Sequence, residues 1–85
     1  MTDQKIDELI EMCTDENFYM ILGSLISAET LTDNVICRNN LCLADRLIES
    51  INRSCISSVK KKLWTDKLMN CKTIIKKDLE LFENE

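Results

Sequence analysis

The chain has 85 residues, a net charge of −4 at pH 7, one glycine and no proline. This length is that of a single domain with a small core, so we expect residues 1–85 to form one helical domain. Scarcity of the residues that shape tight turns excludes a fold of many short strands and predicts an all-α protein.

The first third of the chain predicts two helices. The earlier one has apolar residues at helical spacing: Ile6, Leu9, Ile10 and Cys13. Thr2 or Asp3 is expected to cap it. The later helix begins after the cap-type residue Thr14 and continues to Ile26. Because its apolar residues cover more than one face, it is predicted to be the central and most buried helix.

Two further helices are expected in the middle of the chain. A short one, capped by Thr30 or Thr32, ends at Asn39-Asn40, because asparagine tolerates the left-handed conformation that closes helices. An amphipathic helix from Leu41 to Arg53 then follows. Short connections between these elements favour antiparallel neighbours.

The stretch from Ser54 to Phe82 predicts a long lysine-rich C-terminal helix capped by Ser54. One apolar row comprises Ile56, Val59, Leu63, Ile74 and Leu81. A second row, roughly a quarter turn away, comprises Trp64, Leu68, Cys71, Ile75, Leu79 and Phe82. The apolar surface shifts from the first row to the second at Trp64, next to the cap-type residues Thr65 and Asp66. A break near Thr65 would give six helices, and an unbroken helix would give five.

We therefore expect a small antiparallel bundle of five to six helices. The core is predicted to contain Ile10, Ile21, Leu22, Leu25, Leu47, Ile48, Ile51, Ile56, Leu63, Leu68 and Ile75. Charge is segregated along the same chain: residues 1–50 hold ten acidic and three basic side chains, and residues 54–77 hold seven lysines and Asp66. This pattern favours an acidic face packed on the lysine-rich helix, with an acidic external partner as the alternative.

Cysteine usage indicates the compartment. There are five cysteines and no histidine, and the cysteines lack the paired short spacing of structural zinc sites, so no metal is expected. The N-terminal residues do not resemble a secretory signal, which predicts a reducing intracellular compartment, the cytoplasm. Cys37 and Cys42 are the pair most open to exposure, because they flank a predicted loop.

Catalysis is not expected. Without histidine, a general base would require a perturbed Asp, Glu, Cys or Lys, and no signature marks one. No catalytic or cofactor-binding residue, no cofactor and no small-molecule substrate is therefore predicted. No apolar run approaches the roughly 18 residues that span a bilayer, so no membrane partner is expected either.

Nucleic acid is an alternative partner for the lysine-rich helix. Lys61, Lys72 and Lys76 share one face, but the other lysines scatter around the helix. A surface that follows phosphates is more coherent and normally includes arginine. Solvated lysines that cover apolar neighbours are the favoured interpretation.

Binding of another protein is the function that the sequence favours. A small acidic bundle with a wide apolar surface suits docking of a partner helix, or self-association into a homodimer. Tyr19 and Trp64 are residue types that anchor interfaces, with core packing as their alternative role. The candidate partner-binding residues are Tyr19, Lys61, Trp64, Lys72 and Lys76.

The segment LISAETLTDNVICRNNLCLADRLIESI, residues 25–51, resembles the middle of a caspase-recruitment domain of the death-fold class. In that pattern a helix ends, a Leu-Thr pair opens a short helix, and a loop leads to a longer amphipathic helix. The resemblance implies six short helices and an adaptor function. The long lysine-rich C-terminal stretch departs from it at the sixth helix.

Composition also bears on origin. Ala, Gly and Pro total three, against twenty-five Ile, Lys and Asn, a bias that AT-rich coding produces. Viruses, phages and low-GC microbes share this bias, and small non-enzymatic viral proteins frequently act by binding a host protein. A viral or microbial modulator or inhibitor is therefore the specific expectation, with a constitutive subunit of a larger complex as the alternative.

Overall fold

The computed structural model describes residues 3–27 and 32–83, and the regular structure within them is helical. The helices are α1 (Asp3–Met12), α2 (Asp15–Leu25), α4 (Asn34–Arg53) and α5 (Ser58–Glu83). The all-α class is confirmed, but these ranges hold four helices where five to six were predicted. The predicted caps Thr2 and Thr30 lie outside the described residues.

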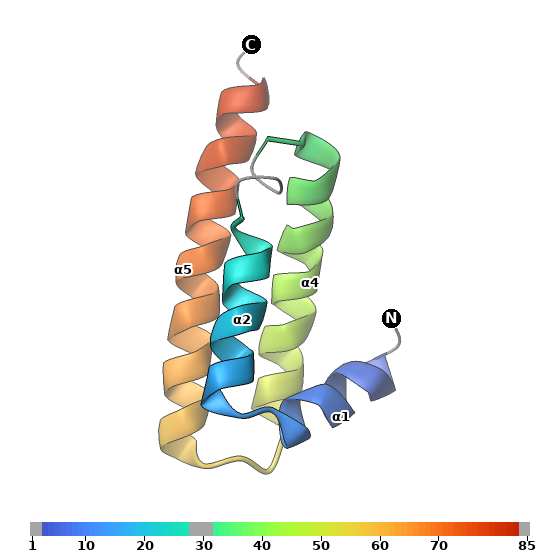
Figure 1. The fold of residues 1–85 in the computed structure, drawn as a ribbon, viewed down its shortest axis with the longest axis vertical. Helices are drawn as coiled ribbons and strands as arrows, with labels where there is room; N and C mark the ends of the chain where they lie inside the picture. The colour runs from blue at the N-terminus through green and yellow to red at the C-terminus, as the bar shows by residue number, and fades with distance from the viewer. Residues whose placement is uncertain (1–2, 28–31, 84–85) are drawn as a thin grey trace.

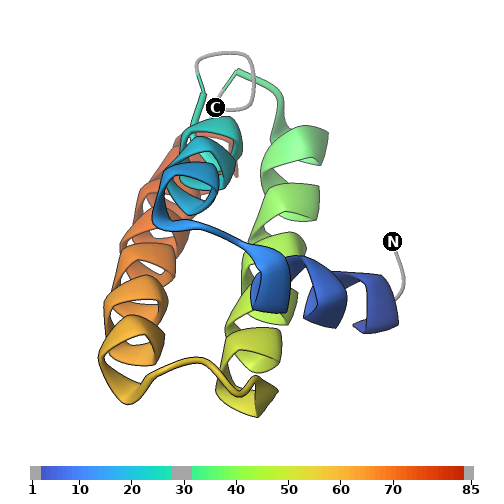
Figure 2. The ribbon, with the colours of Figure 1, turned by 60° about the horizontal axis from the view of Figure 1, so that its bottom comes forward.

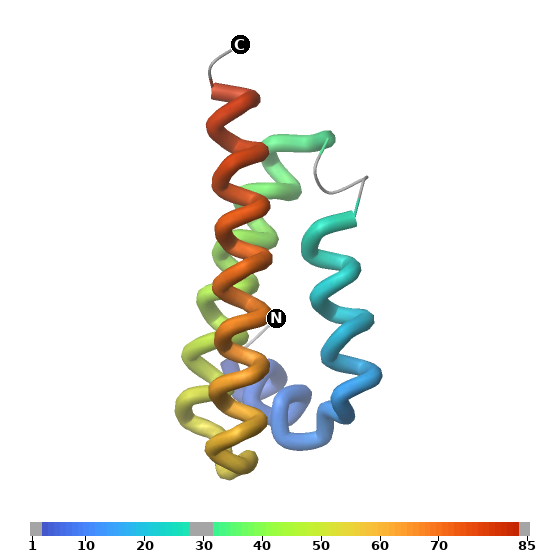
Figure 3. Tube along the Cα trace, turned by 90° about the vertical axis from the view of Figure 1, so that its left-hand side faces the viewer, coloured from blue at the N-terminus to red at the C-terminus, as the bar shows by residue number. Residues whose placement is uncertain are grey.

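Three of the helices lie along the long axis of a molecule that measures 43 × 24 × 19 Å. α2 and α5 run in the same direction and α4 runs antiparallel to both (Figure 1). α5 packs on α4 and on α2, and α4 packs on α5 and on α1. Figure 3 shows α2 and α5 side by side along most of the length of α2. α2 was predicted to be the central helix and is not, because the most extensive helix–helix contact is between α4 and α5. Tyr19 and Met20 on α2 are exposed.

α1 does not run along the bundle. It lies across the C-terminal half of α4, with which it makes its main contacts (Figures 1 and 2). Its buried side chains, Ile6 and Ile10, are fully shielded from solvent. A short link then leads to α2, whose N-cap is Thr14, as predicted: the Thr14 hydroxyl oxygen accepts the backbone N–H of Asn17 at 3.1 Å.

α4 is one helix of 20 residues, where two helices were predicted. Its N-cap is Asp33 and not Thr32: the Asp33 carboxylate accepts the backbone N–H of Val35 at 2.8 Å. Asn39-Asn40 lies inside the helix, and no described residue has the left-handed backbone that would end a helix there. Burial explains the difference, because one stripe of side chains continues through this point: Cys37, Ala44, Leu47 and Ile51.

α5 is likewise a single helix of 26 residues, without the predicted break near Thr65. Ser54 does not begin it: this residue is the C-cap of α4, and its hydroxyl donates to the Ile51 carbonyl at 2.7 Å. Ser57 accepts the backbone N–H of Lys60 at the start of α5. The helix continues past Thr65 because its second apolar row is unbroken and buried: Trp64, Leu68, Cys71, Ile75 and Leu79.

The main core cluster draws buried side chains from all four described helices. At its centre the Phe18 and Trp64 rings stack at 4.3 Å, and the Trp64 indole N–H donates to Asp15 at 3.2 Å. Seven predicted core residues are buried: Ile10, Leu22, Leu25, Leu47, Ile51, Leu68 and Ile75. Three more are half-buried at its edge: Ile21, Ile48 and Ile56. Leu63 is 43% exposed, so its assignment to the core is wrong.

Candidate partner-binding groove

An apolar groove of about 250 Å³ lies between α2 and α4, with α1 contributing one wall. Figure 2 shows how α1 crosses near one end of these two helices. Seven side chains line the groove: Leu9, Ile21, Ser24, Leu25, Asn40, Leu43 and Leu47. None of these lining residues carries a charge. The groove can therefore receive apolar side chains, with hydrogen-bonding groups at Ser24 and Asn40.

α2 and α4 are joined by a polar contact within the groove. The side-chain amide of Asn40 donates to the backbone carbonyl of Leu25 at 3.3 Å. Leu25 and Leu47 are almost fully buried and form the floor, whereas Leu43 is half-buried. The floor is thus part of the core, and the groove is its partly open side.

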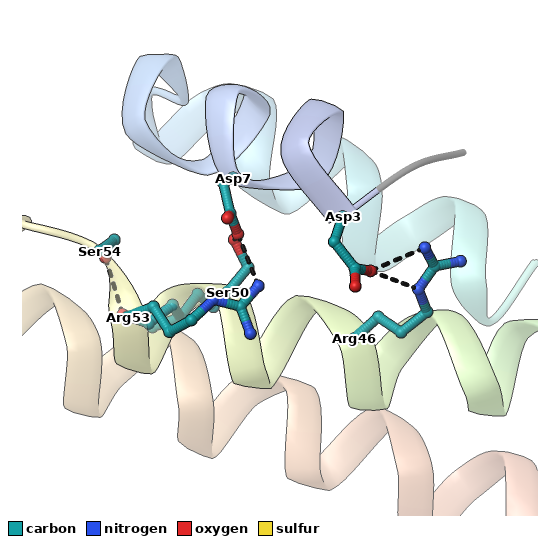
Figure 4. Close-up of polar contacts among 7 residues, drawn as sticks. Asp3, Asp7, Arg46, Ser50, Arg53 and Ser54 are labelled. Carbon is teal, nitrogen blue, oxygen red and sulfur yellow. Dashed lines mark hydrogen bonds and ion pairs between the residues drawn. The ribbon is translucent and has the colours of Figure 1, made fainter.

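Polar contacts hold α1 in the position that shapes the groove (Figure 4). The Arg46 guanidinium donates to the Asp3 carboxylate at 2.9 and 3.2 Å. Asp7 accepts from the Ser50 hydroxyl at 2.6 Å and from Arg53 at 2.7 Å. These two donors, Ser50 foremost, lower the pKa of the Asp7 carboxyl below its ordinary value of 3.8. Together with the buried side chains of Ile6 and Ile10, these polar contacts orient α1 across α4.

Exposed apolar residues lie on α1 and α2, two of the helices that line the groove. Leu9 is 40% exposed on α1, Met20 is 67% exposed on α2, and Met12 is 82% exposed beside Leu9. Methionine adapts its shape to different partners. An exposed apolar margin around a partly open core is typical of a protein-binding surface.

This groove was not predicted from the sequence. Leu9 belongs to the apolar row expected to face inward, and Leu43 is absent from the predicted core. A signal was nevertheless present: Ile36, Asn40, Leu43 and Leu47 recur at spacings of 4, 3 and 4, which defines a second stripe on α4 beside the one that faces α5. Recognising it would have required treating residues 34–53 as one helix.

The predicted partner-binding aromatic residues have different environments. Trp64 is 1% exposed and stacked on Phe18, so it is a core residue and presents no surface to a partner. Tyr19 is 51% exposed on α2, and the Lys67 ammonium lies 5.9 Å from its ring centroid. Tyr19 does not line the groove.

The three lysines predicted to share a face do not form one free basic surface. The Lys61 ammonium donates to the Asn52 carbonyl at 3.4 Å, and Lys72 forms an ion pair with Asp45, so both side chains are directed toward α4. Lys76 is exposed. Among the ion pairs of the described residues, Lys72–Asp45 is the one that joins an α5 lysine to the acidic N-terminal half.

The cysteines are all free thiols. Cys37 and Cys42 lie within α4 and not on a loop, contrary to the prediction. Cys37 is buried and its thiol donates to the Asp78 carboxylate, whereas Cys42 is exposed. Burial raises the pKa of Cys37, and it also raises the pKa of the buried thiols Cys13 and Cys71.

Within residues 3–27 and 32–83, no helix is long and apolar enough to cross a membrane. The same residues bring together no group of three or more His, Cys, Asp or Glu side chains that could hold a metal ion. Comparisons with protein-family models, curated proteins and solved structures found no match for this chain. The loop between a short and a longer helix, on which the death-fold resemblance depends, is replaced by the continuous α4.

Proposed function

We propose that this chain is a non-enzymatic protein-interaction module that binds one amphipathic helix of another protein in the groove between α2 and α4. The observation that carries the proposal is the groove itself, which is apolar, uncharged and partly open beside the core. A helix laid in such a groove presents apolar side chains at positions i, i+3 or i+4, and i+7.

The size of the groove favours side chains of a protein over a small molecule. Its volume of about 250 Å³ is below the ~300–1,000 Å³ of pockets that enclose drug-sized ligands. The uncharged lining selects an uncharged contact face, because a charged group would lose its hydration there without gaining a counter-charge. Ser24 and Asn40 are the two polar side chains of the lining.

The biological role that we propose is that of a modulator or inhibitor of the partner protein, from a viral or microbial source with AT-rich coding. Occupation of the groove would withdraw the partner's helix from its other contacts. The chain needs no catalytic group for this activity. Its five cysteines are all free, which suits the reducing cytoplasm that we propose as its compartment.

The test uses a phage-displayed library of helical peptides about four turns long. We expect selection against the protein to enrich sequences with apolar residues at the spacing given above. The enriched peptides should bind at least about tenfold more weakly to Leu9→Glu and to Leu43→Glu, because each variant places an unpaired charge beside apolar side chains.

Met69→Glu is the matched control, since Met69 is 49% exposed on α5 and does not line the groove. Circular dichroism establishes that each variant retains its helix content. Retained folding with equal peptide binding by all the variants would refute the proposal, as would the failure of any helical peptide to be enriched. Using variants on two helices, α1 and α4, keeps the test valid if one of them is unstable.

A further inference from the structure

A second apolar surface lies on the outer side of α5, away from the groove. Four large apolar side chains on it are exposed: Val59, Leu63, Ile74 and Leu81. With the polar residues Asp66, Asn70 and Lys77 they form one stripe along the helix, at spacings of 4, 3, 4, 4, 3 and 4. This is an 11-residue repeat, which keeps a stripe on one side of a nearly straight helix. The stripe is about 33 Å long.

The spacing of positions in the stripe is symmetric about Asn70. Val59 and Leu81 each lie eleven residues from Asn70, and Leu63 and Lys77 each lie seven residues from it. A helix with such a stripe can pair with an antiparallel copy of itself without any mismatch in register. Val59 then meets Leu81 of the copy, Leu63 meets the aliphatic part of its Lys77, and Ile74 lies opposite its Asp66.

We propose that α5 pairs with the α5 of a second copy of this chain, antiparallel, about a two-fold axis at Asn70. The partner of the stripe is thus a second copy of this chain. The contact is isologous, because both copies use the same surface, as in a closed two-fold dimer. This inference concerns a face other than the groove and does not depend on the proposed function.

Charge complementarity is the first argument for a second copy as the partner. The N-terminal half of α5 carries four lysines and one aspartate, and its C-terminal half carries three lysines together with Asp78, Glu80 and Glu83. Lys62 and Glu80 are 18 residues apart, which is five full turns, so they flank the stripe on the same side. In the antiparallel pair Lys62 of one copy lies within about 3 Å, along the axis, of Glu80 of the other. Neither forms an ion pair with the described residues of its own chain.

The shape of the surface is the second argument. A shallow hollow of about 440 Å³ lies at the N-terminal end of the stripe, lined by Ser58, Val59, Lys62, Leu63 and Asp66. In the antiparallel register Leu81 of the second copy lies over this hollow, and Lys77 of that copy lies within reach of Asp66. The exposed Leu81, 67% accessible in one chain, gains an apolar site with a charged rim.

The first measurement is the mass in solution, by light scattering after size exclusion in reductant. We expect a dimer, and we expect Val59→Glu to raise its dissociation constant at least about tenfold, because the new charge enters an apolar contact. Val35→Glu is the matched control. Val35 is 61% exposed and, like Val59, is the second residue of its helix, so both variants add the same charge at the same helical position.

The register is tested by disulfide formation in a Cys42→Ser/Cys55→Ser background, which removes the two exposed thiols. Val59→Cys and Leu81→Cys chains are prepared separately and mixed. We expect covalent dimers that each contain one chain of either kind. Covalent dimers formed by Val59→Cys alone would indicate a parallel pair and would overturn the proposal.

A charge exchange provides the final test. Lys62→Glu alone and Glu80→Lys alone should each weaken the dimer. The double variant should restore it, because opposite charges again face each other between the two copies, with their positions exchanged. A wild-type monomer at all concentrations, or a dimer insensitive to Val59→Glu, would overturn the inference. Neither result bears on peptide binding by the groove, so the two proposals fail separately.

Discussion

Asp7 joins α1 to α4 through two polar contacts. Its carboxylate accepts from Ser50 and from Arg53, one turn apart on α4, and it lies between the buried residues Ile6 and Ile10. The carboxylate therefore fixes both the rotation of α1 and its position along α4. Because α1 supplies Leu9 to the groove, this residue also shapes the proposed binding surface.

The lowered pKa of Asp7 predicts how stability depends on pH. A carboxyl whose pKa is lower in the folded state stabilises the fold above its ordinary pKa of 3.8, and this contribution is lost as the pH falls through the lowered value. We expect Asp7→Asn to lower the melting temperature at pH 7. As the pH falls through the lowered pKa, the variant and the wild type should come to differ less, because Asp7 becomes protonated in the folded as well as in the unfolded wild type.

Thermal unfolding followed by far-UV circular dichroism between pH 7 and pH 2 provides the measurement. Glu8→Gln is the control, since it removes an adjacent charge that forms no ion pair with the described residues. Equal melting temperatures for Asp7→Asn and Glu8→Gln at pH 7 would contradict the role assigned to Asp7.

At the scale of the helix, Gly23 in α2 provides a direct test of helix propensity. A Cβ atom at this position would meet no atom within 4 Å. Gly23→Ala should therefore stabilise the protein by about 0.5–1 kcal/mol, through the reduced backbone entropy of the unfolded chain. Urea unfolding measures the change.

Gly23→Val separates propensity from packing. Valine is a poorer helix former than alanine, so its gain should be smaller if propensity is the cause. A larger gain for valine would instead indicate a new apolar contact. A loss of stability with alanine would contradict the open environment of Gly23.

The helix boundaries that the sequence predicted correctly depend on local chemistry. Thr14 caps α2 through a hydrogen bond to a residue three positions away, and both partners are visible in the sequence. Asn39-Asn40 and Thr65 have equally suitable side chains, but neither ends a helix. There the continuous burial of α4 against α5 outweighs the local preference for a cap, and that burial depends on a partner distant in the sequence.

The contrast between local sequence preference and packing against distant residues also explains which features of the candidate site were predicted. The two apolar rows of α5 were recognised from spacing alone. Which row would be buried could not be deduced, because the answer depends on where α2 and α4 pack. For that reason the sequence predicts Trp64 as a partner-binding residue, with core packing as its alternative role. The groove requires side chains from three helices, so no local pattern could contain it.

At the scale of the molecule, the core cluster predicts that the chain unfolds as one unit. Ile10 of α1, Phe18 of α2, Leu47 of α4 and Trp64 of α5 belong to the same cluster. For about 85 residues the total free energy of unfolding is of the order of 4–13 kcal/mol. This small total means that no helix is stable independently of the others. Loss of packing contacts at one end of the molecule should therefore also destabilise the other end.

Ile10→Ala tests this coupling, because Ile10 is fully buried in α1 while Trp64, the single tryptophan, reports from α5. Removal of the buried methyl and methylene groups should cost about 2–5 kcal/mol. If the chain is one cooperative domain, the urea midpoint from Trp64 fluorescence must fall by the same amount as the midpoint from far-UV circular dichroism. A fluorescence midpoint that stays in place while the dichroism midpoint moves would mean that α1 unfolds separately. The groove, which depends on Leu9, would then be formed in a fraction of the folded molecules, and a partner helix would have to supply the free energy that orders α1.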